Sequence, residues 1–179
     1  MVLYYTNKYT QRRGESRELL QKAFSLYTGS ELVGKNLVES IIIRGKNGKP
    51  AIEEFDEFSV SHSEEVWAVL IGNNICGLDV QYEKCVQYLK LAKRFYNEDE
   101  EKSVQEKGIE EFFRIWTRRE ALIKALGASV ISTDIPSVLG KDVKIDGHTY
   151  YLSNIENPIT EGKKLYIAVC IRDSIQNIK

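Results

Sequence analysis

The segment from Phe112 to Gly127 constrains the fold of this chain most, because its pattern predicts one amphipathic helix. When successive residues are placed about 100° apart around a helix, its large apolar side chains share one arc, which must face a core. These side chains are Phe112, Ile115, Trp116, Leu122, Ile123 and Leu126. Glu120 and Lys124 lie one turn apart at the edge of that arc, and Gly127 suits the left-handed position that ends a helix. The Glu120–Lys124 pair is either an ordinary surface ion pair or part of a reaction site on a rigid element.

Length and charge limit the class of protein. A chain of 179 residues suits one domain, or two small lobes that share a core. With 42% hydrophobic and 28% charged residues, the composition is that of an ordinary soluble globular protein. The balance of 25 basic and 26 acidic residues gives a net charge of -1, so no overall field attracts nucleic acid or an anionic membrane.

The cysteines and the first residues indicate the compartment. Cys76, Cys85 and Cys170 are odd in number and lack the spacing of metal ligands, which favours a reducing environment. Met1-Val-Leu-Tyr-Tyr5 is followed at once by polar residues, which predicts no signal peptide. No apolar run approaches membrane-spanning length. We therefore expect a cytoplasmic protein.

The first part of the chain predicts a helix followed by strands. Residues 14–27 carry apolar side chains at helical spacing, and Gly29 closes this helix. Arg12, Arg13 and Arg17 cluster around its first turns, either as solvated surface or as an anion site. A β-branched run and a glycine-containing turn predict a hairpin at 41–52. Further strands are expected at 58–63, 66–71 and 75–81.

The remaining chain predicts helices and then short strands. Residues 82–95 have a helical pattern, whereas the strongly charged residues 97–107 predict a mobile connector into the helix that ends at Gly127. Asp146-Gly147 is a hairpin turn signal. The strands expected after Gly127 are 137–139, 143–145, 149–152 and 164–171. This order indicates an α+β fold with two antiparallel sheets, which permits two similar lobes, each a long helix packed on a small sheet.

Asp79 is out of place in its predicted strand. It lies between Leu78 and Val80, in a run that should be largely buried. A buried carboxylate must be paired, bind a metal, or lie at the end of the strand and face a cleft. A common structural alternative is an Asp that caps the following helix.

Four segments together resemble one family. They are Gly48-Lys-Pro50, Val60-Ser-His-Ser63, Gly77-Leu-Asp-Val-Gln81 and Trp116-Thr-Arg-Arg-Glu-Ala-Leu-Ile-Lys124. In this order and at this spacing, they resemble the 4′-phosphopantetheinyl transferases of the surfactin-synthetase-activating type. The resemblance covers roughly residues 14–171.

The resemblance implies an activity and its partners. The phosphopantetheine arm of coenzyme A would be transferred to a serine of an apo acyl carrier protein or peptidyl carrier protein domain, with Mg²⁺ bound at the coenzyme A pyrophosphate. It also implies a cleft between an N-terminal lobe, residues 1–72, which contacts the coenzyme A phosphates, and a C-terminal lobe, residues 73–179, which holds the metal and the catalytic residues. We expect a monomer that binds neither nucleic acid nor membrane.

The resemblance also implies roles for individual residues. Asp79 and Glu120 would ligate the metal, and Glu120 would take the serine proton, directly or through a metal-bound water. Lys124 would stabilise the charge on the reacting phosphate or protonate the leaving group. The residues implied to contact coenzyme A are Arg17, Lys49, Ser61 and His62. In isolation, His62 would more often be structural and Lys49 a solvated turn residue.

Two departures from the family pattern matter. Gln81 stands where the family usually has Glu, so the third metal ligand would be an amide, and a site with three acids is excluded. The segment before the first predicted helix is short, so contacts that it supplies elsewhere would be missing or replaced by Arg12 and Arg13. The alternative interpretation is a catalytically weakened module that binds coenzyme A or a carrier protein.

Overall fold

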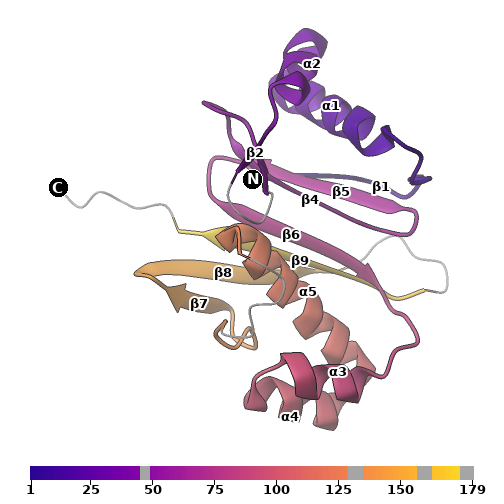
Figure 1. Cartoon of the computed structure of the whole chain (residues 1–179), viewed down its shortest axis with the longest axis vertical. Coiled ribbons are helices and arrows are strands. Elements are labelled where there is room, and N and C mark those ends of the chain that lie inside the picture. Colours follow the sequence, from indigo (N-terminus) through magenta and orange to yellow (C-terminus); the bar gives the residue numbers. More distant parts are fainter. Residues whose placement is uncertain (45–48, 129–134, 157–162, 174–179) are drawn as a thin grey trace.

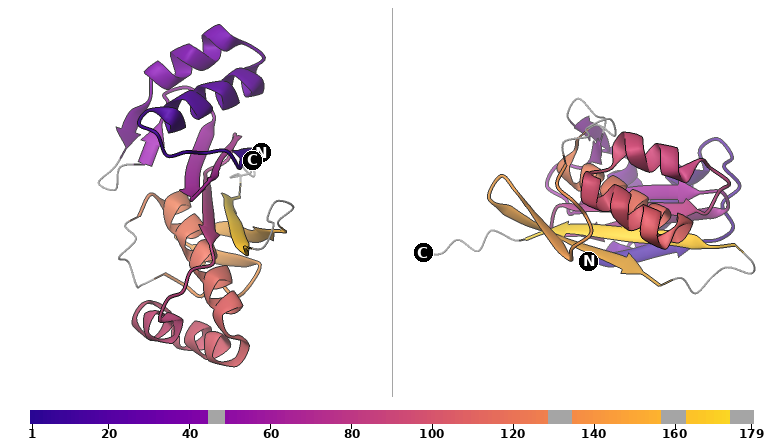
Figure 2. Two further views of the ribbon diagram at one scale, coloured as in Figure 1. Left: turned by 90° about the vertical axis from the view of Figure 1, so that its right-hand side faces the viewer. Right: turned by 90° about the horizontal axis from the view of Figure 1, so that it is seen from below.

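The computed structural model describes residues 1–44, 49–128, 135–156 and 163–173. Helices α1 and α2 lie at one end of the molecule and α3 and α4 at the other, with the strands and α5 between them (Figures 1 and 2). None of the helices within the described ranges combines the length and the apolar composition needed to cross a bilayer.

The elements up to residue 72 form one helix-covered sheet. Strands β1, β5 and β4 pair antiparallel in the order β1-β5-β4, and β2 and β3 form a separate hairpin. Helix α1 packs on α2 and on β5. The bounds are β1 (Val2–Thr6), α1 (Glu15–Thr28), α2 (Glu31–Glu39), β2 (Ile42–Arg44), β3 (Lys49–Ala51), β4 (Glu57–Ser63) and β5 (Val66–Gly72).

The later elements form a second sheet with its own helix. Four strands pair antiparallel in the order β6-β9-β8-β7, and α5 packs on β6, β9 and β8. Helix α4 connects α3 to α5 and packs on both. The bounds are β6 (Cys76–Tyr82), α3 (Tyr88–Phe95), α4 (Glu98–Lys107), α5 (Ile109–Leu126), β7 (Asp142–Ile145), β8 (His148–Ile155) and β9 (Leu165–Arg172).

The two sheets pack against one another. Alternate residues of β5, such as Ala68 and Leu70, form a buried cluster with Leu78 and Val80 of β6 and with residues of β9. The other face of β5 packs under α1 and α2. Every residue of β5 is therefore buried, which explains the nearly continuous apolar run in its sequence.

Most of the predicted elements are confirmed, as is the α+β class. The helix that begins at Glu15 ends at Gly29 (φ 72°), and the helix predicted to end at Gly127 does so, with φ 62°. The Asp146-Gly147 turn has positive φ at both residues, 50° and 77°, as a tight hairpin turn requires. The predicted hairpin at 41–52 forms as β2 and β3, but its turn at residues 46–48 lies outside the described residues.

Several expectations were wrong. The charged residues 97–107 form helix α4 rather than a mobile connector, and the helix predicted over 82–95 begins only at Tyr88, because Tyr82 still belongs to β6. Residues 137–139 form no strand, and β2 and β3 make a third sheet beside the two expected. Helix α2 and strand β1 were not predicted. Strand β1 is short and only partly buried, which explains its weak pattern.

Candidate functional site

Strand β6 and helix α5 lie in direct contact at Gly77. A Cβ at this position would stand 1.8 Å from the carbonyl oxygen of Ala121 and 2.7 Å from the amide nitrogen of Ala125. Both are backbone atoms of α5, so the helix would have to move away. Glycine therefore allows α5 to lie against the face of β6 that also carries Asp79 and Gln81, since alternate residues of a strand share a face.

Asp79 is buried on this face, with 7% of its surface exposed. Its Oδ1 accepts hydrogen bonds from Lys124 Nζ at 2.8 Å and from Ser61 Oγ at 3.0 Å. Burial raises the pKa of Asp79 above its usual range, and the charge and hydrogen bond of Lys124 oppose that rise. Of the environments that the sequence left open for this buried carboxylate, the described residues show pairing, with Lys124 as the partner.

Lys124 pairs with this buried carboxylate and is itself partly exposed. Besides Asp79, its ammonium donates to the carbonyl oxygen of Leu78 at 2.9 Å and to Ser61 Oγ at 3.0 Å. Its side chain remains 31% exposed. The ammonium therefore has fixed partners inside the chain while part of the side chain stays open to a ligand.

Glu120 lies one helical turn before Lys124 and is half-buried. It forms no hydrogen bond or ion pair with any residue in the described ranges. Burial raises the pKa of Glu120 to about 6, and the negative charge of Asp79 adds to the rise, whereas Lys124 and Arg119 oppose it. Two carboxylates from different elements thus lie close enough to repel one another, as expected of groups that can share a cation.

Gln81 follows Asp79 on the same face of β6. Its Nε2 donates to the carbonyl oxygen of Tyr82 at 3.0 Å and to Ser63 Oγ at 3.4 Å, and no described residue donates a hydrogen bond to its amide oxygen. The carboxylates of Asp79 and Glu120 and this amide oxygen are the hard ligands that Mg²⁺ prefers, so the residues fit such an ion. Among the described residues there is no cluster of three or more His, Cys, Asp or Glu side chains suited to a metal, so a site here would have two carboxylates.

Three serine hydroxyls join β4 to β6, and we call them the serine ladder. Each accepts a backbone N–H of β6, at distances of 3.0, 3.2 and 3.0 Å: Ser59 from Leu78, Ser61 from Val80 and Ser63 from Tyr82. The partners are 19 residues apart each time, so the two strands run parallel and in register although they belong to different sheets. The serine ladder brings Ser61 beside Asp79.

The other predicted contacts of coenzyme A lie apart from this cluster. His62 is exposed, because neighbouring residues of β4 point to opposite faces, and its ring lies 5.3 Å from that of Tyr9. Lys49 is partly buried and donates to the carbonyl oxygen of Cys76 at 3.2 Å and to Glu57 at 3.3 Å.

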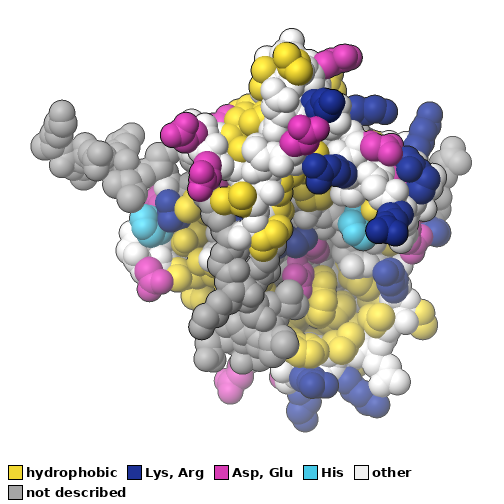
Figure 3. All heavy atoms as spheres, turned by 45° about the horizontal axis from the view of Figure 1, so that its top comes forward, with side chains coloured by type: hydrophobic (Ala, Val, Ile, Leu, Met, Phe, Trp, Pro, Cys, Tyr) yellow, Lys and Arg dark blue, Asp and Glu magenta, His cyan; other side chains and the backbone are white. Residues whose placement is uncertain are grey.

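Arg17 is exposed on α1, and Lys8, Arg12 and Arg13 are exposed in the segment before this helix. Lys and Arg side chains gather on one side of the face that carries α1 (Figure 3). Arg12 pairs with Glu18 at 2.7 Å.

A buried ion pair supports α5 and was missed from the sequence. Glu100 of α4 is fully buried and accepts hydrogen bonds from Arg119 Nη1 at 2.7 Å and from the backbone N–H of Val138 at 2.8 Å. Asn97 and Glu100 form a capping box, and this pattern is the sequence signal that could have identified α4.

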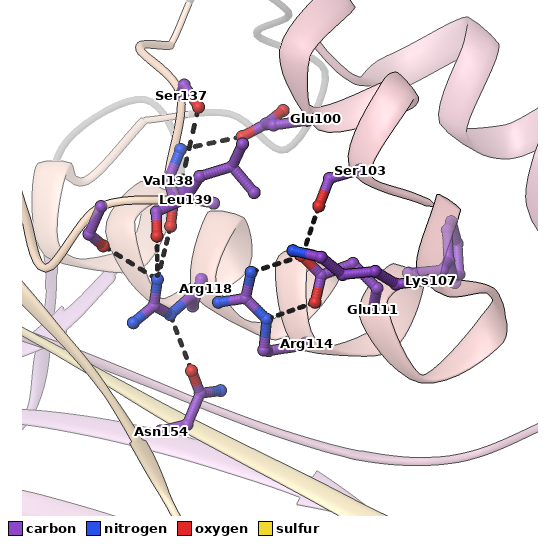
Figure 4. Close-up of polar contacts among 12 residues, drawn as sticks. Glu100, Ser103, Lys107, Glu111, Arg114, Arg118, Ser137, Val138, Leu139 and Asn154 are labelled. Atoms are coloured by element: carbon purple, nitrogen blue, oxygen red, sulfur yellow. Dashed lines mark hydrogen bonds and ion pairs between the residues drawn. The ribbon is translucent and has the colours of Figure 1, made fainter. Parts of the chain in front are cut away.

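Arg118 ties α5 to the chain beyond it. Its Nη1 donates to the carbonyl oxygens of Val138, Leu139 and Gly140, and its Nε donates to Asn154 of β8 at 2.7 Å (Figure 4). Arg118 and Arg119 directly precede Glu120, so these buried contacts fix the turn of α5 that carries it.

Comparison with known proteins gives a consistent match. Residues 75–157 match the 4′-phosphopantetheinyl transferase superfamily, and this range includes Asp79, Gln81, Glu120 and Lys124. The 4′-phosphopantetheinyl transferase gsp of Aneurinibacillus migulanus is 28% identical over 120 residues, which cover 60% of this chain and 50% of the relative. The 4′-phosphopantetheinyl transferase psf-1 of Bacillus pumilus is 31% identical over 101 residues, which cover 52% of this chain and 42% of the relative. The chain thus spans about half the length of the curated relatives it matches.

Proposed function

We propose that this chain transfers the phosphopantetheine arm of coenzyme A to a serine of a carrier protein, because its residues 75–157 match the 4′-phosphopantetheinyl transferase superfamily. The serine oxygen forms a bond to the phosphorus that carries the pantetheine arm, and the bond from that phosphorus to adenosine 3′,5′-bisphosphate breaks. The observation that carries the proposal is the meeting of Asp79, Glu120 and Lys124, from β6 and α5, within the matched range.

Asp79 and Glu120 are the residues that would hold Mg²⁺, with the amide oxygen of Gln81 or water as a further ligand. When bound, this ion would neutralise charge on the pyrophosphate. An amide in place of a third carboxylate lowers the negative charge of the site by one, so we expect weaker metal affinity with activity retained.

Glu120 is the proposed base. It is half-buried, and no hydrogen bond or ion pair with the described residues occupies its carboxylate. A pKa raised to about 6 leaves it ionised near neutral pH and more basic than an ordinary carboxylate, which favours uptake of the serine proton. Lys124, partly exposed and one turn further on, is placed to stabilise the charge on the leaving phosphate or to protonate it.

Residues before 73 would bind the rest of coenzyme A. Lys49, His62 and Arg17 are proposed phosphate contacts, and the exposed basic residues around the start of α1 support this for Arg17. We propose that the two lobes divide between residues 72 and 73 and that coenzyme A binds between them. The boundary between the two helix-covered sheets supports this division. Free thiols at Cys76, Cys85 and Cys170 suit a cytoplasmic protein, and we propose that it acts as a monomer.

The proposal is tested by incubating the chain with coenzyme A, Mg²⁺ and a panel of apo acyl and peptidyl carrier proteins, read by intact mass. We expect the mass of at least one carrier to increase by one phosphopantetheine group. Glu120→Gln should abolish the transfer, whereas Glu106→Gln, at an exposed position of α4, should not. Wild-type turnover by a folded Glu120→Gln variant would show that Glu120 is neither the base nor an essential ligand.

Gln81 favours one other candidate, a module that binds coenzyme A or a carrier protein without turning it over. Isothermal titration of coenzyme A with and without Mg²⁺ separates the two candidates. Binding that strengthens with Mg²⁺ supports the enzyme. Binding that is indifferent to Mg²⁺, without any product on the carrier panel, supports the module.

A further inference from the structure

The hydroxyl of Ser61 makes all three of its possible hydrogen bonds within the described part of the chain. A serine hydroxyl donates one hydrogen bond and accepts two. Ser61 Oγ donates to Asp79 Oδ1 at 3.0 Å and accepts from Lys124 Nζ at 3.0 Å and from the N–H of Val80 at 3.2 Å. The residue is also buried, with 6% of its surface exposed. A direct contact with coenzyme A, which the family resemblance implies for Ser61, would require it to give up one of these bonds.

The neighbouring rung of the serine ladder provides a comparison within the same strand. Ser59 is equally buried, at 4%, and accepts the N–H of Leu78 at 3.0 Å. Within the described part of the chain, its hydroxyl makes no hydrogen bond to Asp79 or Lys124. The two serines thus contribute alike to joining β4 and β6. Of these two hydroxyls, only that of Ser61 also bonds to Asp79 and Lys124 within the described residues.

We propose that Ser61 is a positioning residue, whose hydroxyl fixes the carboxylate of Asp79 and the ammonium of Lys124 relative to one another and to β4. The inference rests on the proposed function and deepens it. Ser61 lies on β4, Asp79 on β6 and Lys124 on α5. One hydroxyl therefore joins three elements from both halves of the chain at the proposed reaction site, which is the task of a group that orients catalytic side chains.

The test compares Ser61→Ala with Ser59→Ala, which removes the same hydroxyl from a neighbouring rung. With coenzyme A and an accepted apo-carrier, Ser61→Ala should lower kcat about 10- to 100-fold, as loss of an orienting hydrogen bond commonly does, with KM for coenzyme A unchanged. Ser59→Ala should keep the wild-type kcat. Ser61→Thr keeps the hydroxyl and should recover most of the kcat.

A second measurement does not depend on turnover. Lys124 is labelled with an amine-reactive reagent and quantified by peptide mass spectrometry, with the exposed Lys93 of α3 as the internal reference. Removing one partner of the ammonium should raise the labelling of Lys124 in Ser61→Ala, whereas Ser59→Ala should resemble wild type. The melting temperatures of Ser61→Ala and Ser59→Ala should fall by similar amounts, because each variant loses one hydrogen bond to a backbone N–H of β6.

The outcomes separate the possibilities. A raised KM for coenzyme A with kcat unchanged in Ser61→Ala would assign Ser61 to substrate binding and overturn the proposal. Equal losses of kcat in Ser61→Ala and Ser59→Ala would show that Ser61 acts only by joining β4 to β6. This result would also overturn the proposal. If the wild-type chain modifies no carrier protein, the proposed function fails. Unchanged labelling of Lys124 in Ser61→Ala would refute the positioning role, whether or not the chain modifies a carrier.

Discussion

At the scale of single residues, Glu120 combines two properties that lower the stability of the folded chain. It is half-buried, and it lies near the negative charge of Asp79. Both disfavour its ionised form, and a pKa raised from 4.5 to about 6 corresponds to roughly 2 kcal/mol. A strained charge of this kind is commonly retained where function requires it.

Glu120→Gln should therefore stabilise the metal-free protein while it abolishes transfer. The folded state raises the pKa of Glu120, so it binds more protons than the unfolded state, and stability is lost as pH rises from about 4.5 to 6. In thermal melts with a chelator, the variant should match wild type near pH 4 and melt higher at pH 7.5. The melting temperature of Glu106→Gln should match that of wild type at both pH values, because this side chain is exposed. A variant that melts lower than wild type at pH 7.5 would contradict this account.

Gly77 determines how closely α5 approaches β6. Gly77→Ala places a methyl group 1.8 Å from the carbonyl oxygen of Ala121, and only a shift of backbone can relieve the clash. We expect a loss of about 1–3 kcal/mol in the free energy of unfolding, measured in urea, together with reduced transfer. Gly140→Ala is the control, since its nearest neighbour would stand at 3.4 Å, an ordinary contact. Equal stability of the two variants would show that α5 adjusts freely.

Single-residue patterns predicted part of the site and missed part. Asp79 was recognisable because an acid in an apolar run must be paired, bind a metal or face a cleft. The serine ladder was not, because the alternation in Phe58-Ser-Val-Ser-His-Ser63 predicts a strand without showing which face is buried. Here the serine face is buried against β6, and the exposed His62 lies on the opposite side. Which face is buried depends on the second sheet, which is distant in sequence.

At the scale of elements, helix α4 shows how composition can mislead. Its sequence is almost entirely charged or polar, yet Glu100 and Val104 are fully buried. The capping box at Asn97 begins the helix, and Glu100 is satisfied by Arg119 of α5. Long apolar stripes such as those of α1 and α5 are predictable from periodicity, whereas α4 depends on a tertiary ion pair that no periodicity records.

Glu100→Ala should destabilise the chain strongly. The substitution leaves the guanidinium of Arg119 buried without its carboxylate and the N–H of Val138 without its acceptor. We expect a loss of about 3–5 kcal/mol in urea unfolding, the usual result of breaking a buried pair from one side. Glu106→Ala, on the same helix but exposed, should cost little. Similar midpoints for the two variants would mean that the buried pair contributes no net stability.

At the scale of the whole molecule, the two sheets share a buried cluster and the serine ladder, so the halves should unfold together. Each half carries one tryptophan, Trp67 in β5 and Trp116 in α5. In Trp116→Phe the fluorescence reports the first half, and in Trp67→Phe it reports the second.

Within each tryptophan variant, the fluorescence and far-ultraviolet circular dichroism midpoints in urea should coincide. Because each comparison is made within one protein, any stability lost through the substitution itself cancels. A fluorescence transition that precedes the circular dichroism transition in either variant would show that one half unfolds independently.

The serine ladder also bears on how the protein avoids self-association. Strand β4 is the last strand of one sheet and β6 the first of the other, so each is an edge whose backbone groups could recruit a foreign strand. The hydroxyls of Ser59, Ser61 and Ser63 occupy N–H groups along the edge of β6, while the body of β4 covers it. The first sheet thus shields this edge of the second, and a fragment holding the second sheet alone would present an open template for aggregation.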